Sequence, residues 1–257
     1  DVYLVLDEDF NTLASLGALK NLDMLVGGDK EFDSNVFYSS VYKAGQYEGS
    51  QYALPMECNP TLMFVNKTLL QKEGIKVPDN DWTWDDFYDI CKTIVKDSDG
   101  DGQMDQFGCY DYTWLQAVYS NGITPFNQSG TSSNFLDEKF SQSLEFVKRL
   151  EATNRNYQVT SNDFDLGKVA FRPFTFSDYR TYMPYPWRIK KYSGFEWTCI
   201  RMPAGPSGDN RSEMSALMAG MSSRTEKKQC AWDFVKLLTT DTAVSYTHLT
   251  LPTTSRV

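Results

Sequence analysis

Apolar and polar positions follow two different periods along the chain, and these periods predict alternating strands and helices. The apolar run at residues 2–6 is continuous, which is typical of a buried strand. Apolar side chains recur every three or four positions over residues 135–152 and 225–238, which predicts two amphipathic helices. Strands that alternate with helices indicate an α/β protein that binds ligands at the carboxyl ends of its strands.

Local signals mark a turn and the start of a helix. Tyrosines alternate with polar residues over residues 46–54, which predicts a hairpin with its turn at residues 48–50. Thr83 precedes Asp85 and Asp86. A threonine is a good N-cap, and carboxylates in the first turn are favoured by the helix dipole, so a helix is expected to begin at this point.

Charge and composition exclude several classes of protein. The net charge of −9 argues against nucleic acid as a partner, because a phosphate-binding surface needs clustered Lys and Arg. No apolar run approaches the about 20 residues that a membrane-spanning helix needs. The five cysteines are widely separated and form no CxxC, so most of them are predicted to be buried small side chains, and no disulfide framework is expected.

The segment at residues 52–87 carries the strongest family signal. Leu54-Pro55 ends one apolar run, a polar step follows at residues 57–60, and a second run leads into Asn66-Lys67. A tryptophan-rich helix start comes next at residues 82–87. This order resembles the family 1 extracellular solute-binding proteins, the sugar-capturing subunits of ABC importers. The segments at residues 1–23, 167–171, 202–206 and 222–238 are similar to further parts of that family.

The resemblance implies an α/β, two-lobed periplasmic-binding-protein-like fold of type II, incomplete at both ends. Lobe one is expected to hold residues 1–57, with its N-terminal part missing, and residues 203–243, while lobe two holds residues 58–202. Residues 244–254 resemble a translated sequencing adapter, so residues 244–257 are interpreted as a non-native tail. The sole histidine, His248, lies in that tail, which disfavours nucleophilic Ser-His or Cys-His catalysis.

The resemblance also implies a sugar site, because carboxylates accept strong hydrogen bonds from hydroxyls and aromatic faces bury C–H surface. The expected binding residues lie after the first strand, at the crossing between lobes, and on lobe two: Asp7, Glu8, Asp9, Glu57, Asn59, Tyr112, Trp114, Phe174, Phe176 and Asp178. Each has a structural alternative. Asp7 or Asp9 would cap a helix, Trp114 would belong to the core, and Asp178 would pair with Arg180.

By this resemblance the protein is the non-catalytic substrate-binding component of an ABC transporter and captures a sugar or oligosaccharide. The implied partner is a membrane permease, and the implied state is a monomer outside the cytoplasm, as a cell-surface lipoprotein or in the periplasm. No cofactor is required. Two alternatives stay open, namely a carbohydrate-active enzyme that uses a carboxylate pair and a calcium-dependent interaction module.

One acidic loop indicates a structural Ca²⁺. Oxygen ligands occupy positions one, three, five and nine of the loop, with glycine at six and a backbone carbonyl available at seven, as in a calcium loop. The candidate ligands are Asp97, Asp99, Asp101, Gln103 and Asp105. Gly108 stands at position twelve, where a bidentate Glu is usual, so weaker affinity is expected. The alternative is a solvated acidic turn.

Overall fold

The computed structural model describes residues 1–127, 130–155, 157–175, 177–178 and 194–240. These residues divide into two compact units, one formed by Asp1–Asn59 and the chain from Met214 on, the other by Pro60–Glu213. Residues 203–213, expected in lobe one, therefore lie in unit two. Backbone hydrogen bonds explain this, since Ala204 bonds both Trp82 and Trp84, and Gly205 donates to Ser120.

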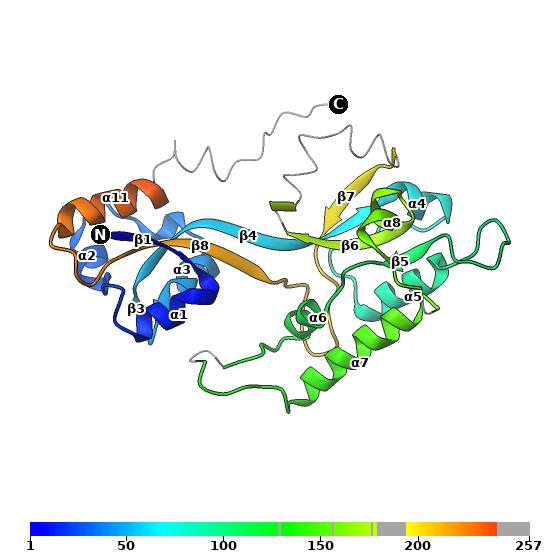
Figure 1. Cartoon of the computed structure of the whole chain (residues 1–257), viewed down its shortest axis with the longest axis horizontal. Coiled ribbons are helices and arrows are strands. Elements are labelled where there is room, and N and C mark those ends of the chain that lie inside the picture. The colour runs from blue at the N-terminus through cyan, green and yellow to red at the C-terminus, as the bar shows by residue number, and fades with distance from the viewer. Residues whose placement is uncertain (128–129, 156, 176, 179–193, 241–257) are drawn as a thin grey trace. The chain divides into compact units, whose positions relative to one another are not determined.

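Unit one is built on antiparallel strands flanked by helices (Figure 1). The strand β1 pairs with β8 with Val2 opposite Met221, and β8 neighbours β4. Residues Glu48 and Gly49 have φ of 50° and 82°, which suits the tight turn of the predicted hairpin, present as β2 and β3. The elements are β1 (Val2–Leu6), α1 (Asp7–Ser15), α2 (Asp23–Gly28), η1 (Ser34–Val36), α3 (Ser39–Ala44), β2 (Gln46–Tyr47), β3 (Ser50–Gln51), the first part of β4 (Ala53–Asn66), β8 (Met214–Met221) and α11 (Lys228–Thr240).

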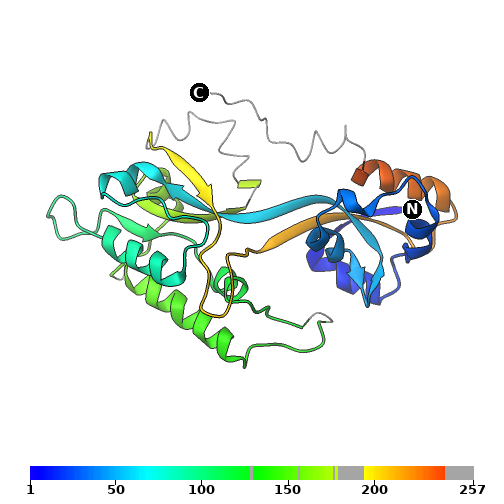
Figure 2. The same cartoon turned by 180° about the vertical axis from the view of Figure 1, so that it is seen from behind.

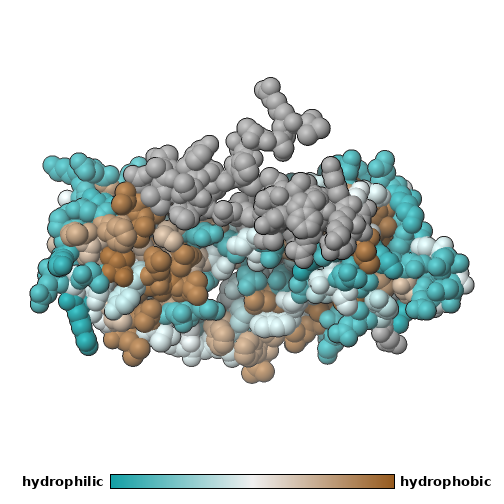
Figure 3. Space-filling view, turned by 45° about the horizontal axis from the view of Figure 1, so that its top comes forward, coloured by the Kyte–Doolittle hydropathy of each residue, from teal (hydrophilic) through white to brown (hydrophobic). Residues whose placement is uncertain are grey.

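The first strand differs from its prediction as a buried strand. Val5 is buried, but Tyr3, Leu4 and Leu6 are 45%, 60% and 47% exposed. Among the described residues β1 pairs with β8 alone, so its other edge carries no strand. Figure 3 shows hydrophobic surface on the part of the molecule that carries unit one.

Unit two contains a mixed sheet with helices packed on it (Figures 1 and 2). The strand β4 pairs antiparallel with β6 and β7, and β6 pairs parallel with β5. The helix α5 packs on β5, and α7 packs against α5 and α6. The elements are α4 (Lys67–Lys72), α5 (Trp84–Ile94), β5 (Phe107–Cys109), α6 (Trp114–Ser120), α7 (Glu138–Ala152), α8 (Ser161–Asp165), β6 (Val169–Thr175) and β7 (Trp197–Ile200).

The core of unit two forms where α5 and α7 meet the sheet. Trp84 and Phe146 stack with ring centroids 4.2 Å apart. The predicted start of α5 is confirmed, because the Thr83 hydroxyl accepts from the Asp86 backbone N–H and the Asp86 carboxylate accepts from the Thr83 backbone N–H. Helix α7 is also confirmed, with Asp137 as its N-cap. Among the described residues, every helix is too short or too polar to cross a bilayer.

Candidate functional site

Three carboxylates follow the carboxyl end of β1 in unit one. Asp7, Glu8 and Asp9 form the first turn of α1, and the N-cap residue is Leu6, which makes no side-chain cap. Glu8 and Asp9 are exposed and Asp7 is half-buried. The alternative that Asp7 or Asp9 caps this helix is therefore not what the structure shows. Carboxylate oxygens accept hydrogen bonds, so these three side chains can bind the hydroxyls of a polyhydroxylated ligand.

Glu57 and Asn59 lie within β4, at the end of the part that belongs to unit one, and both are half-buried. Side chains alternate along a strand, so these two lie on one face and Cys58 lies on the other. Burial, with a smaller effect from the Glu57 charge, raises the pKa of the Cys58 thiol. The thiol therefore stays protonated and is not a nucleophile at neutral pH.

Two aromatic residues that were expected to stack on sugar have opposite environments in unit two. Tyr112 lies in the core, only 6% exposed, and its hydroxyl accepts from Trp84 Nε1 at 3.2 Å. Burial raises the pKa of this phenol. Trp114 is 42% exposed at the first residue of α6, so it is not the core residue of the alternative interpretation. Of these two residues, Trp114 is the one whose side chain is exposed in the described conformation.

Two of the expected sugar-binding residues at the end of β6 make contacts within the protein. Phe174 is buried and packs edge-on against Phe64, with ring centroids 5.0 Å apart. Asp178 is exposed, and its carboxylate accepts from the Thr175 hydroxyl at 2.7 Å and from the Thr175 backbone N–H at 3.2 Å. Phe176 and Arg180, the partner suggested for Asp178, lie outside the described residues.

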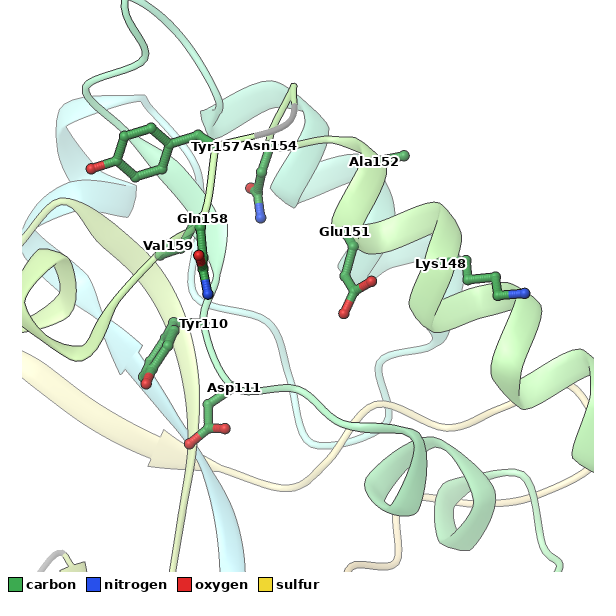
Figure 4. A pocket seen from close by; sticks show the side chains of 9 residues that line it. All are labelled: Tyr110, Asp111, Lys148, Glu151, Ala152, Asn154, Tyr157, Gln158 and Val159. Carbon is green, nitrogen blue, oxygen red and sulfur yellow. The ribbon is translucent and has the colours of Figure 1, made fainter.

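Unit two also contains a pocket of about 530 Å³ between α7 and the segment that follows β5 (Figure 4). Figure 4 shows the Glu151 carboxylate and the Asn154 amide pointing toward the open space, while Lys148 extends away from it. Asn154 Oδ1 is buried and has no hydrogen-bond partner among the described residues. The lining is Tyr110, Asp111, Lys148, Glu151, Ala152, Asn154, Tyr157, Gln158 and Val159.

The sequence did not predict this pocket, and none of the expected binding residues line it. Asp111 adopts φ of 64°, which is uncommon for a residue with a side chain. The Arg172 guanidinium lies over the Tyr110 ring, 4.9 Å from its centroid, and Arg172 Nη2 lies 3.9 Å from Asp111 Oδ2. The sequence signal that could have indicated this pocket was the position of Tyr110 and Asp111 directly after β5. The rest of its lining, from α7 and residues 157–159, reaches the pocket only through tertiary packing.

The acidic loop brings together three of its four predicted carboxylate ligands. One carboxylate oxygen from each of Asp97, Asp99 and Asp105 lies within 4.8 Å of the others. The Asp97 carboxylate accepts from the backbone N–H groups of Gly102 and Gly100, which lower its pKa. Asp101 accepts from the backbone N–H of Gln103 at 2.7 Å and does not belong to this carboxylate cluster. The clustered hard oxygens suit Ca²⁺ or Mg²⁺.

Comparison with known proteins gives one consistent family. The sequence matches the family described as bacterial extracellular solute-binding protein over residues 1–244. The sugar-binding protein MalE from Xanthomonas citri has a TM-score of 0.75 at 17% identity and covers 93% of this chain. The protein UspC of M. tuberculosis has a TM-score of 0.74 at 18% identity and covers 96%. The ABC substrate-binding protein Lmo0181 from Listeria monocytogenes, solved in complex with cycloalternan, has a TM-score of 0.70 at 20% identity and covers 95%.

These solved structures are longer than the present chain. The matched regions cover 61% of MalE, 65% of UspC and 62% of Lmo0181, so the chain spans less than two thirds of each. Together with the α/β elements described above, the likeness shows the fold of a two-lobed binding protein, present in part.

Proposed function

Because the chain belongs to the bacterial extracellular solute-binding proteins, we propose that it is the substrate-binding component of an ABC importer and captures a sugar or oligosaccharide. The carbohydrate in the Lmo0181 complex supports this class of ligand. The whole protein would act outside the cytoplasm as a monomer, in the periplasm or as a cell-surface lipoprotein, and would deliver its cargo to a membrane permease. It would release the sugar unchanged.

The observation that carries the proposal is the exposed side chain of Trp114 at the first residue of α6. An indole face buries the apolar C–H surface of a sugar, and its fixed geometry loses little freedom on binding. In unit one, the exposed carboxylates of Glu8 and Asp9 supply acceptors for sugar hydroxyls. A neutral sugar is bound through both kinds of group, because ring faces cover its C–H surface and carboxylates accept hydrogen bonds from its hydroxyls.

Isothermal titration calorimetry with neutral mono- and oligosaccharides tests the proposal on the chain as it stands. We expect saturable binding that Trp114→Ala weakens by about tenfold, or about 1.4 kcal/mol. Tyr38→Ala is the matched control, because Tyr38 is 84% exposed in unit one and belongs to no proposed site. Chromatography of the sugar after incubation checks for turnover. Absence of sugar binding by a cooperatively folded sample would overturn the proposal, and product formation would favour the enzyme alternative.

We also propose that the acidic loop binds a structural Ca²⁺ through Asp97, Asp99 and Asp105. Support comes from the convergence of their oxygens within 4.8 Å. The role would be to hold the connection between α5 and β5, since the loop lies between these elements. Sugar binding that persists after chelation would count against a calcium-dependent interaction module.

A further inference from the structure

A row of aromatic rings lies on unit two beyond Trp114. We call it the aromatic row, and it consists of Trp114, Phe140, Phe135 and Phe126. Successive ring centroids lie 5.9, 5.0 and 5.5 Å apart in that order. Phe140 is 7% exposed, while Trp114, Phe135 and Phe126 are 42%, 46% and 52% exposed. The buried ring of Phe140 therefore packs against the exposed rings of Trp114 and Phe135, and Phe135 in turn packs against Phe126.

Local hydrogen bonds hold the row in place on the connection between α6 and α7 (Figure 1). The Asn134 backbone N–H donates to the Pro125 carbonyl at 2.8 Å, and Asn134 Nδ2 donates to the Thr124 carbonyl at 2.9 Å. Thr124 Oγ1 donates to the Phe126 carbonyl at 2.6 Å. These bonds fix the backbone beside both Phe126 and Phe135, so a ligand would meet rings that are already positioned.

The stretch that carries Trp114, Phe126 and Phe135 contains no charged residue. No Asp, Glu, Lys or Arg occurs from Tyr112 to Leu136, although charged residues make up 23% of the sequence. Its polar side chains are hydroxyls and amides, which donate to and accept from neutral groups. This stretch supplies no cation for a phosphorylated or otherwise anionic ligand, although Asp137, Glu138 and Lys139 follow it directly before Phe140, and its hydroxyls and amides suit the hydroxyls of a neutral sugar.

We propose that the aromatic row binds the outer units of a neutral oligosaccharide, so that the cargo is a chain of several sugars. This inference rests on the proposed function. The exposed rings of Phe126 and Phe135 lie 5.5 Å apart, which is comparable with the length of a pyranose unit, and the buried ring of Phe140 lies between Phe135 and Trp114. A monosaccharide on Trp114 would therefore leave Phe135 and Phe126 uncovered. Exposed aromatic clusters otherwise mark protein interfaces, but the segment lacks the Arg that such interfaces favour.

Calorimetric titrations with ladders of malto-, manno- and cello-oligosaccharides, from the monosaccharide to the hexasaccharide, test this inference on the full chain. In the ladder that binds, affinity should rise with length. Phe126→Ala and Phe135→Ala should each weaken the longer sugars by about fivefold or more and leave the shortest binding sugar unchanged. Phe135→Tyr should retain most of the affinity, since the ring face persists, and Tyr38→Ala should change nothing.

The outcomes separate the two proposals. If sugars bind but neither alanine variant changes how affinity depends on length, the aromatic row has another occupant, such as a protein partner, and the inference is wrong while the proposed function stands. Equal weakening at every length would also overturn it, because the row would then act on the first sugar only. If no ladder binds to folded protein, the proposed function itself fails. A cooperative melt of each variant checks folding.

Discussion

Asp29 and Lys236 form an ion pair in unit one, with 2.6 Å between Asp29 Oδ2 and Lys236 Nζ. The same carboxylate oxygen accepts from Trp232 Nε1 at 2.8 Å. Trp232 is one of the largest fully buried side chains of the chain's described part. The pair therefore links the residue after α2 to α11, two elements that are distant in sequence.

This ion pair predicts a loss of stability in acid. The hydrogen bonds from Lys236 and then Trp232 lower the pKa of Asp29 from 3.8 to about 2. A lowered folded-state pKa means that the stabilisation is fully present above about pH 4 and is lost as the pH falls toward about 2. Urea unfolding of the wild type and Asp29→Asn should differ clearly at neutral pH and converge at the acid end of this window. A difference that stays constant with pH would contradict this account.

Tyr112 and Trp114 should separate stability from binding. Tyr112→Phe removes an acceptor of the Trp84 N–H, although the Ser120 hydroxyl lies 3.2 Å from the same nitrogen. We expect a loss of about 1 kcal/mol in the free energy of unfolding with unchanged sugar affinity. Trp114→Ala should instead weaken sugar binding while it changes the free energy of unfolding by no more than about 0.5 kcal/mol. Weakened sugar binding in Tyr112→Phe, with its fold intact, would show that the Tyr112 hydroxyl takes part in binding and would contradict this account.

Gly108 should not tolerate a side chain. A Cβ at this position would lie 2.3 Å from Cys91 Cβ and 2.6 Å from Cys91 Cα, so relief would require the α5 backbone to move. Gly108→Ala should lower the free energy of unfolding by about 1–3 kcal/mol or more. Gly27→Ala is the matched control, since nothing lies within 4 Å of its Cβ and α2 is helical there. Equal melting temperatures for the two variants would show that α5 and β5 are less closely packed than described.

Calcium should stabilise unit two through the acidic loop. A ligand that binds only the folded state at one hundred times its Kd adds about 2.7 kcal/mol. Adding Ca²⁺ should therefore raise the melting temperature, and EDTA should reverse the rise. Asp97→Asn and Asp105→Asn should abolish the response, whereas Asp101→Asn should retain it because Asp101 lies outside the cluster. An identical response in all three variants would assign the effect to another site.

Local sequence signals correctly predicted helix starts and turns, because these depend on residues that are close together in the sequence. The start of α5 follows from Thr83 and Asp86, and the hairpin turn follows from Glu48 and Gly49. The exposure of β1 could not be predicted, because it depends on which strands lie beside it and not on its own apolar run.

In the candidate site, too, the burial of individual side chains could not be predicted from the sequence. Tyr112 and Trp114 are two residues apart and looked equivalent, yet one is core and the other is exposed. Their difference is set by Trp84 and Ser120, which surround the Tyr112 hydroxyl from α5 and from the end of α6. The pocket beside α7 likewise combines segments that carry no shared pattern. The family resemblance indicated which segments follow strand ends, but it could not predict whether an individual side chain is buried or exposed.

The pairing of β1 with β8 has a consequence for the order in which the chain folds. Val2 lies opposite Met221, so all of unit two is synthesised between the two partners. Contacts between such distant residues form slowly, because a long loop must close first. Unit two comes from one continuous stretch and can fold earlier. Until β8 is synthesised, Val5 and its neighbours on β1 lack their pairing with β8, and this interval is when we expect the chain to be most prone to aggregation.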